Sequence, residues 1–151
     1  MNGLEAFIVR AKAKTYVGDG ASRPPCRPGA HDIACEDGDF TYLDSYFGGS
    51  DFLGQEVVWQ AAAPVWAMNY YGRIVRGDRI DAATAGGVIK QALSALYREG
   101  RFLGGFSFSV GPHVYTDRSE GNAASFSGYE VIEMNGETVY RLDYHGGMIK
   151  A

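Results

Sequence analysis

Seven polar residues in two stretches of this chain have side chains suited to ligand binding or acid–base chemistry. The set combines carboxylates with an amide, a phenol, a guanidinium and an imidazole: Glu56, Asn69, Tyr71, Glu130, Arg141, Asp143 and His145. Convergent polar groups on an otherwise apolar surface are typical of a pocket for a small molecule. Because no serine lies in a G-x-S-x-G motif, the pattern predicts a binding site without defining a reaction.

A histidine and a glutamate in this set could act as a general base. Imidazole titrates near neutral pH, so His145 beside a carboxylate could accept a proton from a substrate, and Glu56 is the alternative base. We expect Glu56 to face Ala67 across a hairpin, which leaves its carboxylate free, whereas Glu130 is expected to face Arg141. A solvent-exposed pair of Glu130 and Arg141, with no role in binding, is the competing interpretation.

The candidate residues belong to two stretches, 52–75 and 126–149, that align with each other without a gap. The matching positions are Phe52 with Phe126, Gly54 with Gly128, Glu56 with Glu130, Val57 with Val131, Val65 with Val139, Tyr70 with Tyr144 and Gly72 with Gly146. The match continues faintly upstream, where Tyr16 corresponds to Tyr97, Tyr42 to Tyr115 and Asp44 to Asp117. Self-similarity of this kind predicts an internal duplication. We expect repeats of about residues 1–77 and 78–151 within a single domain of residues 1–151.

The elements that must position these residues follow from periodicity and turn signals. They are a helix from about Leu4 to Tyr16 with a capping box at Asn2 and Glu5, a Pro-rich loop from Val17 to Asp37, a strand from Phe40 to Phe47, strands at about 53–60 and 65–72, a helix from Asp78 or Asp81 to Arg98, and strands near 105–109, 113–117, 127–134 and 137–145. The predicted fold class is α+β, with a duplicated unit of one helix and three antiparallel strands. Two such units give a mostly antiparallel twisted sheet, or a pair of sheets, with two helices and an internal pseudo-twofold axis.

The Asn135-Gly136 turn sets the expected register of the second hairpin, because a type I′ turn needs positive φ at both positions. One face, predicted to be the core, pairs Val131 with Tyr140, Tyr129 with Leu142 and Ser127 with Tyr144. The other face, predicted to hold the ligand, pairs Ile132 with Val139, Glu130 with Arg141, Gly128 with Asp143 and Phe126 with His145. If the first hairpin has the same register, the Trp66 side chain faces the core, and Glu56, Asn69 and Tyr71 lie on the face predicted to hold the ligand. Gly54 and Gly128 would leave room above the sheet.

Composition and charge exclude several classes of function. The net charge is -4 and lysine and arginine form no run, which disfavours direct nucleic-acid binding. No window approaches 18 apolar residues and the N-terminus has no apolar leader, so we expect no membrane association and a cytoplasmic location.

The cysteines and histidines give little reason to expect a metal or a cofactor. Cys26, His31 and Cys35 supply three ligands in a spacing that matches no common zinc motif, so we expect two free thiols and no metal. Haem is an alternative, with His113, His145, Met68 or a tyrosine as axial ligand, although no C-x-x-C-H motif is present.

Several strings in the chain resemble a family of small bacterial domains of unknown function. They are Tyr42-x-Asp44-x-Tyr46-Phe-Gly, Phe52-x-Gly-x-Glu56-Val-Val, Pro64-Val-Trp66-Ala-Met68-Asn69-Tyr70-Tyr71-Gly72 and Val139-Tyr140-x-x-x-Tyr144-His145-Gly146-Gly147. Members that resemble this chain occur alone or behind an N-terminal helix-turn-helix of the Xre type. The resemblance implies a sensing or effector role, and it supplies no active site.

Together these patterns predict a binding module that holds a small-molecule ligand over the paired hairpins. Two alternatives stay open. One is a hydrolase or isomerase that uses Glu56 or His145, and the other is a dimerisation or protein-interaction module, such as a homodimer, that buries exposed Phe52, Phe126 and Tyr71.

Overall fold

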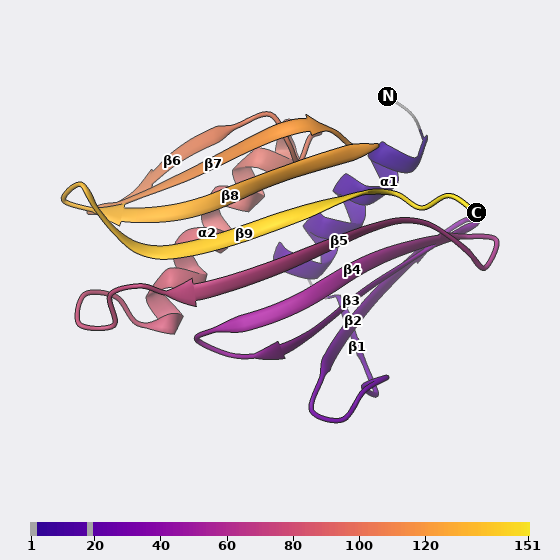
Figure 1. The fold of residues 1–151 in the computed structure, drawn as a ribbon, viewed down its shortest axis with the longest axis horizontal. Coiled ribbons are helices and arrows are strands. Elements are labelled where there is room, and N and C mark those ends of the chain that lie inside the picture. The colour runs from indigo at the N-terminus through magenta and orange to yellow at the C-terminus, as the bar shows by residue number, and fades with distance from the viewer. Residues whose placement is uncertain (1–2, 18–19) are drawn as a thin grey trace.

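A single antiparallel sheet runs through the whole of the computed structural model, which describes residues 3–17 and 20–151, and two helices lie on one of its faces (Figure 1). Its strands are β1 (Ala21–Arg23), β2 (His31–Asp37), β3 (Phe40–Gly48), β4 (Phe52–Gln60), β5 (Ala63–Ile74), β6 (Phe106–Val110), β7 (His113–Asn122), β8 (Ser125–Met134) and β9 (Glu137–Met148). Their order is β1-β2-β3-β4-β5-β9-β8-β7-β6, so β5 and β9 meet at the centre. An α+β class with one mostly antiparallel sheet is confirmed.

The helices begin and end near the predicted positions. The first is α1 (Gly3–Lys12), which continues as the π-helical turn η1 (Ala13–Val17). The second is α2 (Ala82–Arg98), where the Asp81 side chain accepts a 2.7 Å hydrogen bond from the Thr84 amide and so caps the first turn. The predicted capping box at Asn2 lies outside the described residues. No helix in the described ranges is both long and apolar enough to cross a membrane.

The predicted loop at 17–37 is wrong in part, because it contains β1 and β2. The prolines do mark the irregular segment between these two strands, since Pro24, Pro25 and Pro28 all lie there. The sequence signal that this prediction overlooked is the two-residue turn of Gly38 and Asp39. This turn joins β2 to β3, so that Asp37 pairs with Phe40, and Gly38 has a φ of +60°. The first half of the sheet therefore contains the five strands β1 to β5, whereas the predicted unit had three strands.

The turns that close the two central hairpins are alike. Met134 lies opposite Glu137 as predicted, and the intervening Asn135 and Gly136 both have positive φ. In the first hairpin the matching positions are Ala61 and Ala62, with φ of 48° and 68°. Alanine has a Cβ that crowds the backbone in this left-handed region, so the first turn is strained where the second is not.

A β-bulge just after each turn overturns the predicted register. Val139 is an extra residue in β9, so Ile132 pairs with Tyr140 instead of with Val139. Val65 is extra in β5 in the same way, and Val58 pairs with Trp66. Each bulge shifts all later pairs by one residue, which exchanges the two faces of β4 and β8 relative to their partners. The two bulges fall at positions that match in the sequence alignment; an internal duplication itself stays a prediction.

The two faces of the sheet differ in what covers them. The inner face carries the helices, and its core includes Trp66, which is fully buried, stacks on Phe126 at 5.8 Å between ring centroids, and donates a 3.0 Å hydrogen bond to the Ala123 carbonyl. Tyr140 is buried as well, so the predicted inward direction of Trp66 and Tyr140 is confirmed. The outer face carries no helix and faces the viewer in Figure 1.

Replacing the strained turn should stabilise the protein. We expect Ala61→Asn with Ala62→Gly to raise the free energy of unfolding by about 1 kcal/mol, because the left-handed conformation costs alanine about 1–2 kcal/mol per residue. Urea unfolding measures the change. The reverse exchange, Asn135→Ala with Gly136→Ala, should lower stability; equal stability of both variants and the natural protein would contradict the strain argument.

Candidate functional site

The bulges divide the seven predicted site residues between the two faces of the sheet. The outer face receives Asn69, Tyr71, Arg141, Asp143 and His145, whereas Glu56 and Glu130 lie buried on the inner face. The predicted pair of Glu130 with Arg141 is wrong, since Glu130 lies opposite Leu142. The expectation that Ser127 faces the core is also wrong, because it is exposed and lies directly opposite His145.

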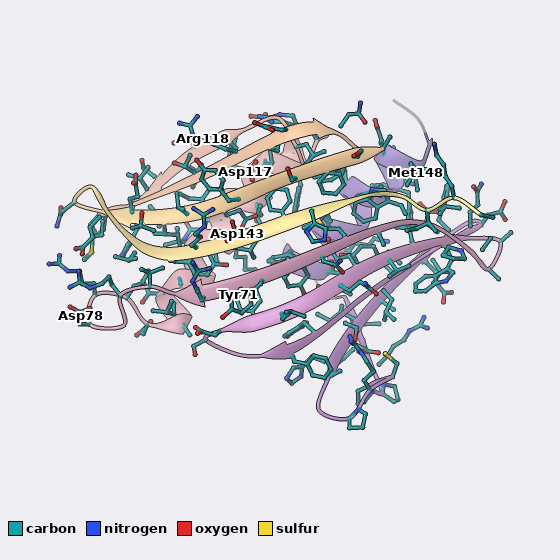
Figure 2. The ribbon with its side chains drawn as sticks, viewed as in Figure 1. Tyr71, Asp78, Asp117, Arg118, Asp143 and Met148 are labelled. Carbon is teal, nitrogen blue, oxygen red and sulfur yellow. The ribbon has the colours of Figure 1, made fainter. Side chains whose placement is uncertain are left out.

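A groove of about 1030 Å³ hollows the outer face, and we call it the outer groove. It extends from the β1–β2 loop to β7, across the central strands. Its polar lining consists of Arg27, Gln55, Asn69, Tyr71, Arg118, Ser119, Glu120, Ser127, Tyr129, Asp143 and His145. Four of the seven predicted residues are in this lining: Asn69, Tyr71, Asp143 and His145. Figure 2 labels Tyr71, Asp143 and Arg118 of the lining.

A ladder of hydrogen bonds crosses the floor of the outer groove from β4 to β9. The Gln55 amide nitrogen donates to the Asn69 Oδ1 at 2.8 Å, and the Asn69 Nδ2 lies 3.2 Å from the His145 Nε2. These three side chains stand on adjacent paired positions of β4, β5 and β9. With the Asn69 oxygen facing Gln55, the Asn69 Nδ2 faces His145, and which of these two groups donates depends on the imidazole tautomer. No hydrogen bond joins His145 to Asp143 among the described residues.

Arginine and aspartate charges surround this ladder. The Arg141 guanidinium donates to Asp143 at 2.6 Å, and the hydrogen bond holds the pKa of that carboxyl below its ordinary value. Arg73 approaches the same carboxylate at 3.6 Å. Arg27 donates to Ser45 Oγ at 2.9 Å and lies over the Phe47 ring, and its charge also acts on the buried carboxylate of Asp32. Arg118 forms no ion pair with a carboxylate in the part of the chain that the structure describes.

The inner face buries an ion pair where a free carboxylate was predicted. Lys12 Nζ lies 2.6 Å from Glu56 Oε2, and the Tyr42 hydroxyl donates a short hydrogen bond to the other oxygen. Glu56 is fully buried and Lys12 is 3% exposed. A substrate cannot reach Glu56 without displacing these partners, so its predicted role as a general base or ligand contact finds no support in the geometry.

Two buried aspartates on the inner face each accept a hydrogen bond from a tyrosine. Tyr70 donates to Asp44 at 2.6 Å, and Tyr144 donates to Asp117 at 2.7 Å. The glycines expected to leave space for a ligand instead make room for these rings. A Cβ on Gly54 would come within 2.3 Å of the Tyr70 hydroxyl, and Gly128 has the same relation to Tyr144.

Burial raises the pKa of three inner-face carboxyls. Loss of hydration raises the pKa of Asp44 to about 7, with Glu56 adding to the shift and the hydrogen bond from Tyr70 opposing it. The pKa of Glu130 rises to about 8, because burial and then the charge of Asp117 disfavour ionisation. The pKa of Asp117 is also raised by burial. The Tyr115 hydroxyl lies near Glu130 and opposes the rise, yet it completes no hydrogen bond of normal geometry within the described chain.

The remaining candidates from the sequence do not form a site. Cys26 is exposed and Cys35 is buried, both as free thiols, and His31 packs beside Tyr46. Across residues 3–17 and 20–151, no three histidine, cysteine or acidic side chains gather as metal ligands. Phe126 is buried and Phe52 packs against the core, so only Tyr71 of the three predicted interface rings is well exposed.

Sequence reasoning missed several residues of the outer groove. Gln55, Ser127 and Tyr129 were assigned to the core because the bulges are not visible in the pattern of apolar residues. Arg27 lies between prolines in a segment without periodicity, and Arg118 follows the predicted end of its strand at Asp117. Extension of β7 to Asn122 is what brings Arg118 to the groove.

Comparison with known proteins identifies a family. The DUF5680 family model, described as a domain of unknown function, matches residues 44–149, which is more than half of the 151 residues. The match includes both hairpins and α2, and it begins after α1 and β2. No curated protein and no solved structure matches this chain.

The raised pKa of Glu130 predicts that the protein loses stability as pH rises. Glu130 stays protonated in the folded state up to about pH 8 but ionises near pH 4.5 when unfolded, so the free energy of unfolding should fall between these two values. A shift of this size corresponds to about 4 kcal/mol between pH 5 and pH 9. Glu130→Gln should remove that part of the decline in urea unfolding, whereas Glu133→Gln on the opposite face should keep it. A decline of equal size in Glu130→Gln would contradict the raised pKa.

Removal of the buried lysine should be costly. Lys12→Met leaves the Glu56 carboxylate buried without a cation, and we expect a loss of about 3–5 kcal/mol in the free energy of unfolding. Lys14→Met, at an exposed lysine two residues later, is the control and should change little. The double variant Lys12→Met with Glu56→Gln should recover part of the loss. Equal effects of the two lysine variants would show that the ion pair is not a structural requirement.

Proposed function

We propose, on the premise that this chain belongs to the DUF5680 family of domains of unknown function, that it is a binding domain for a small organic anion, which it holds in the outer groove. A sensor or effector role fits such a domain. That role and a cytoplasmic location rest on the sequence and the resemblance alone.

The observation that carries the proposal is the presence of two guanidinium groups in one groove. Arg27 comes from the β1–β2 loop and Arg118 from β7, and both line the outer groove. Neither forms a direct ion pair with a carboxylate among the described residues. The lining also contains the carboxylates of Glu120 and Asp143, and Asp143 is already engaged by Arg141 and Arg73. Guanidinium groups bind carboxylates and phosphates through paired, charge-assisted hydrogen bonds.

The floor of the groove supplies neutral contacts for the rest of the ligand. The ladder of Gln55, Asn69 and His145 presents amide and imidazole groups along the groove. Tyr71 is 42% exposed, and Tyr129 lies under the Arg141 guanidinium at 4.6 Å from the ring centroid. Exposed rings and amides suit a planar or hydroxylated molecule. A carboxylate or phosphate attached to a ring or a sugar therefore fits the groove best.

An enzyme remains the second candidate because Ser127 lies directly across from His145 in the groove. A serine opposite an imidazole is the pairing that acyl transfer requires. No hydrogen bond joins the two side chains within the described residues, and the His145 Nε2 is engaged by Asn69. Turnover of an ester or of a phosphoester, lost in both Ser127→Ala and His145→Ala, would favour this alternative over simple binding.

Loss of one groove arginine should weaken binding selectively. Aromatic carboxylates, nucleoside monophosphates and sugar phosphates are the probes, and a ligand at 100 times its Kd should raise the free energy of unfolding by about 2.7 kcal/mol. For the anion that binds, Arg118→Gln should raise Kd about tenfold or more, as expected for a charge-assisted hydrogen bond. Arg98→Gln is the matched control, since it removes an exposed arginine on α2. The proposal fails if no anion of the panel stabilises the protein, or if both variants weaken binding equally.

A further inference from the structure

A second cavity opens on the inner face, between α2 and the turn that joins β3 to β4, and we call it the inner cleft. Its volume is about 330 Å³, which is enough for a molecule with one ring. Side chains from β2, β4, β5 and α2 make its apolar walls: Ile33, Phe52, Ile74, Ala85 and Ile89. The outer groove lies on the opposite face of the same sheet.

Aromatic rings and one carboxylate set the character of the inner cleft. The rings are those of Tyr16, Tyr46, Phe52, Tyr70 and Tyr140. Asp44 is the charged residue in the lining, and no lysine or arginine belongs to it within the described residues. Ring faces carry partial negative charge and attract cations. A cavity of this composition is suited to a positively charged guest and unsuited to an anion.

Two polar atoms of the cleft have capacity left for a ligand. Asp44 receives its hydrogen bond from Tyr70 at the Oδ1 atom, which leaves Oδ2 without a donor among the described residues. The Tyr140 hydroxyl is buried, with the residue only 1% exposed, and it has no hydrogen-bond partner in the same part of the chain. Buried hydroxyls are nearly always paired in folded proteins, so an unpaired one in a cavity wall indicates a place for a guest.

We propose that the inner cleft binds a small organic ammonium ion, which donates N–H groups to Asp44 and Tyr140 and places its charge among the aromatic rings. The carboxylate neutralises the ammonium group, and the tyrosine oxygen accepts a second hydrogen bond. The apolar walls then cover the hydrocarbon part of the ligand. This site shares Tyr70 with the lining of the outer groove but lies on the other face of the sheet and takes a ligand of the opposite charge.

Binding of a cation at Asp44 should be linked to loss of a proton. Burial raises the pKa of Asp44 to about 7, so a large share of the unoccupied protein carries the neutral acid at neutral pH. The groups that face Asp44 from the surrounding elements are Lys12 of α1, Tyr16 of η1, Asp32 of β2, Glu56 of β4, Tyr70 of β5 and Tyr97 of α2. An ammonium ion selects the ionised carboxylate. Affinity should therefore rise about tenfold per pH unit below the pKa and level off above about pH 8.

Titration calorimetry with a charged and an uncharged probe of the same shape tests the proposal. Phenethylamine and benzylamine, both protonated at the pH of the experiment, are the cations, and phenethyl alcohol is the neutral counterpart of the first. At pH 8 we expect phenethylamine to bind at least about tenfold more tightly than the alcohol. Asp44→Asn keeps an acceptor for Tyr70 and removes the charge. This variant should abolish both the preference for the amine and its dependence on pH.

A pair of helix glycines supplies a second, matched test that leaves the carboxylate intact. Gly86 lines the cleft and Gly87 does not, and a Cβ at either position meets no atom within 4 Å. Gly86→Met should fill the cleft and prevent amine binding, while Gly87→Met should bind normally. Both variants are expected to fold, because methionine favours a helix more than glycine does.

The outcomes separate this site from the outer groove. Arg118→Gln should leave amine binding unchanged, so failure of the anion proposal has no bearing on the inner cleft. The inference is overturned if neither ammonium ion binds at millimolar concentration, if the alcohol binds as well as the amine, or if Gly86→Met and Gly87→Met bind the amine equally.

Discussion

The structure depends on the neutralisation of acidic side chains buried beneath two helices. Asp44, Glu56, Asp117 and Glu130 all lie on the inner face, and each is 9% exposed or less. Lys12 is the one cation that reaches Glu56 within the described residues. Ionised carboxylates without partners are very costly in an apolar interior, so the others must be hydrogen-bonded or protonated. Hydrogen bonds from tyrosine hydroxyls, together with protonation, therefore stabilise these buried carboxyl groups in place of additional lysines.

This requirement explains features of the backbone that otherwise lack a purpose. Tyr70 reaches Asp44 only because Gly54 has no side chain in the path of the ring, and Gly128 allows the same for Tyr144. The bulge at Val65 then aligns Glu56 with the helix-covered face, where Lys12 can meet it. Glycine, bulge and lysine thus act together. If any one of these three features were absent, a carboxylate on the inner face would lack its partner.

The sequence predicted the strands that carry strong apolar alternation and failed on the strands that do not. In β9, Tyr140, Leu142 and Tyr144 recur at every second position, and all three point inward as predicted. In β4 the inward positions include Gly54 and Glu56, which no rule based on apolar character assigns to a core. A register taken from the turn alone therefore placed β4 and β8 with the wrong face inward.

The candidate site was found in part for the same reason. Asn69, Tyr71, Asp143 and His145 lie on β5 and β9, whose faces were assigned correctly relative to Trp66 and Tyr140, and they line the outer groove. Arg27 could not be predicted, because its position depends on the pairing of β1 with β2 and not on a local pattern. The inner cleft depends on contacts between α2 and the sheet. Contacts of that range leave no signature in one sequence.

The two cavities lie on opposite faces of the same sheet. Tyr70 contributes to the lining of both, with its hydroxyl bonded to Asp44 on the inner side. Charges on the two sides of a thin layer of protein interact more strongly than charges separated by water, because the effective dielectric constant is lower. However, Arg118 on β7 lies five strand spacings from Asp44 on β3, roughly 24 Å at the usual spacing of neighbouring strands. A ligand at either of these residues therefore has little electrostatic effect on a ligand at the other.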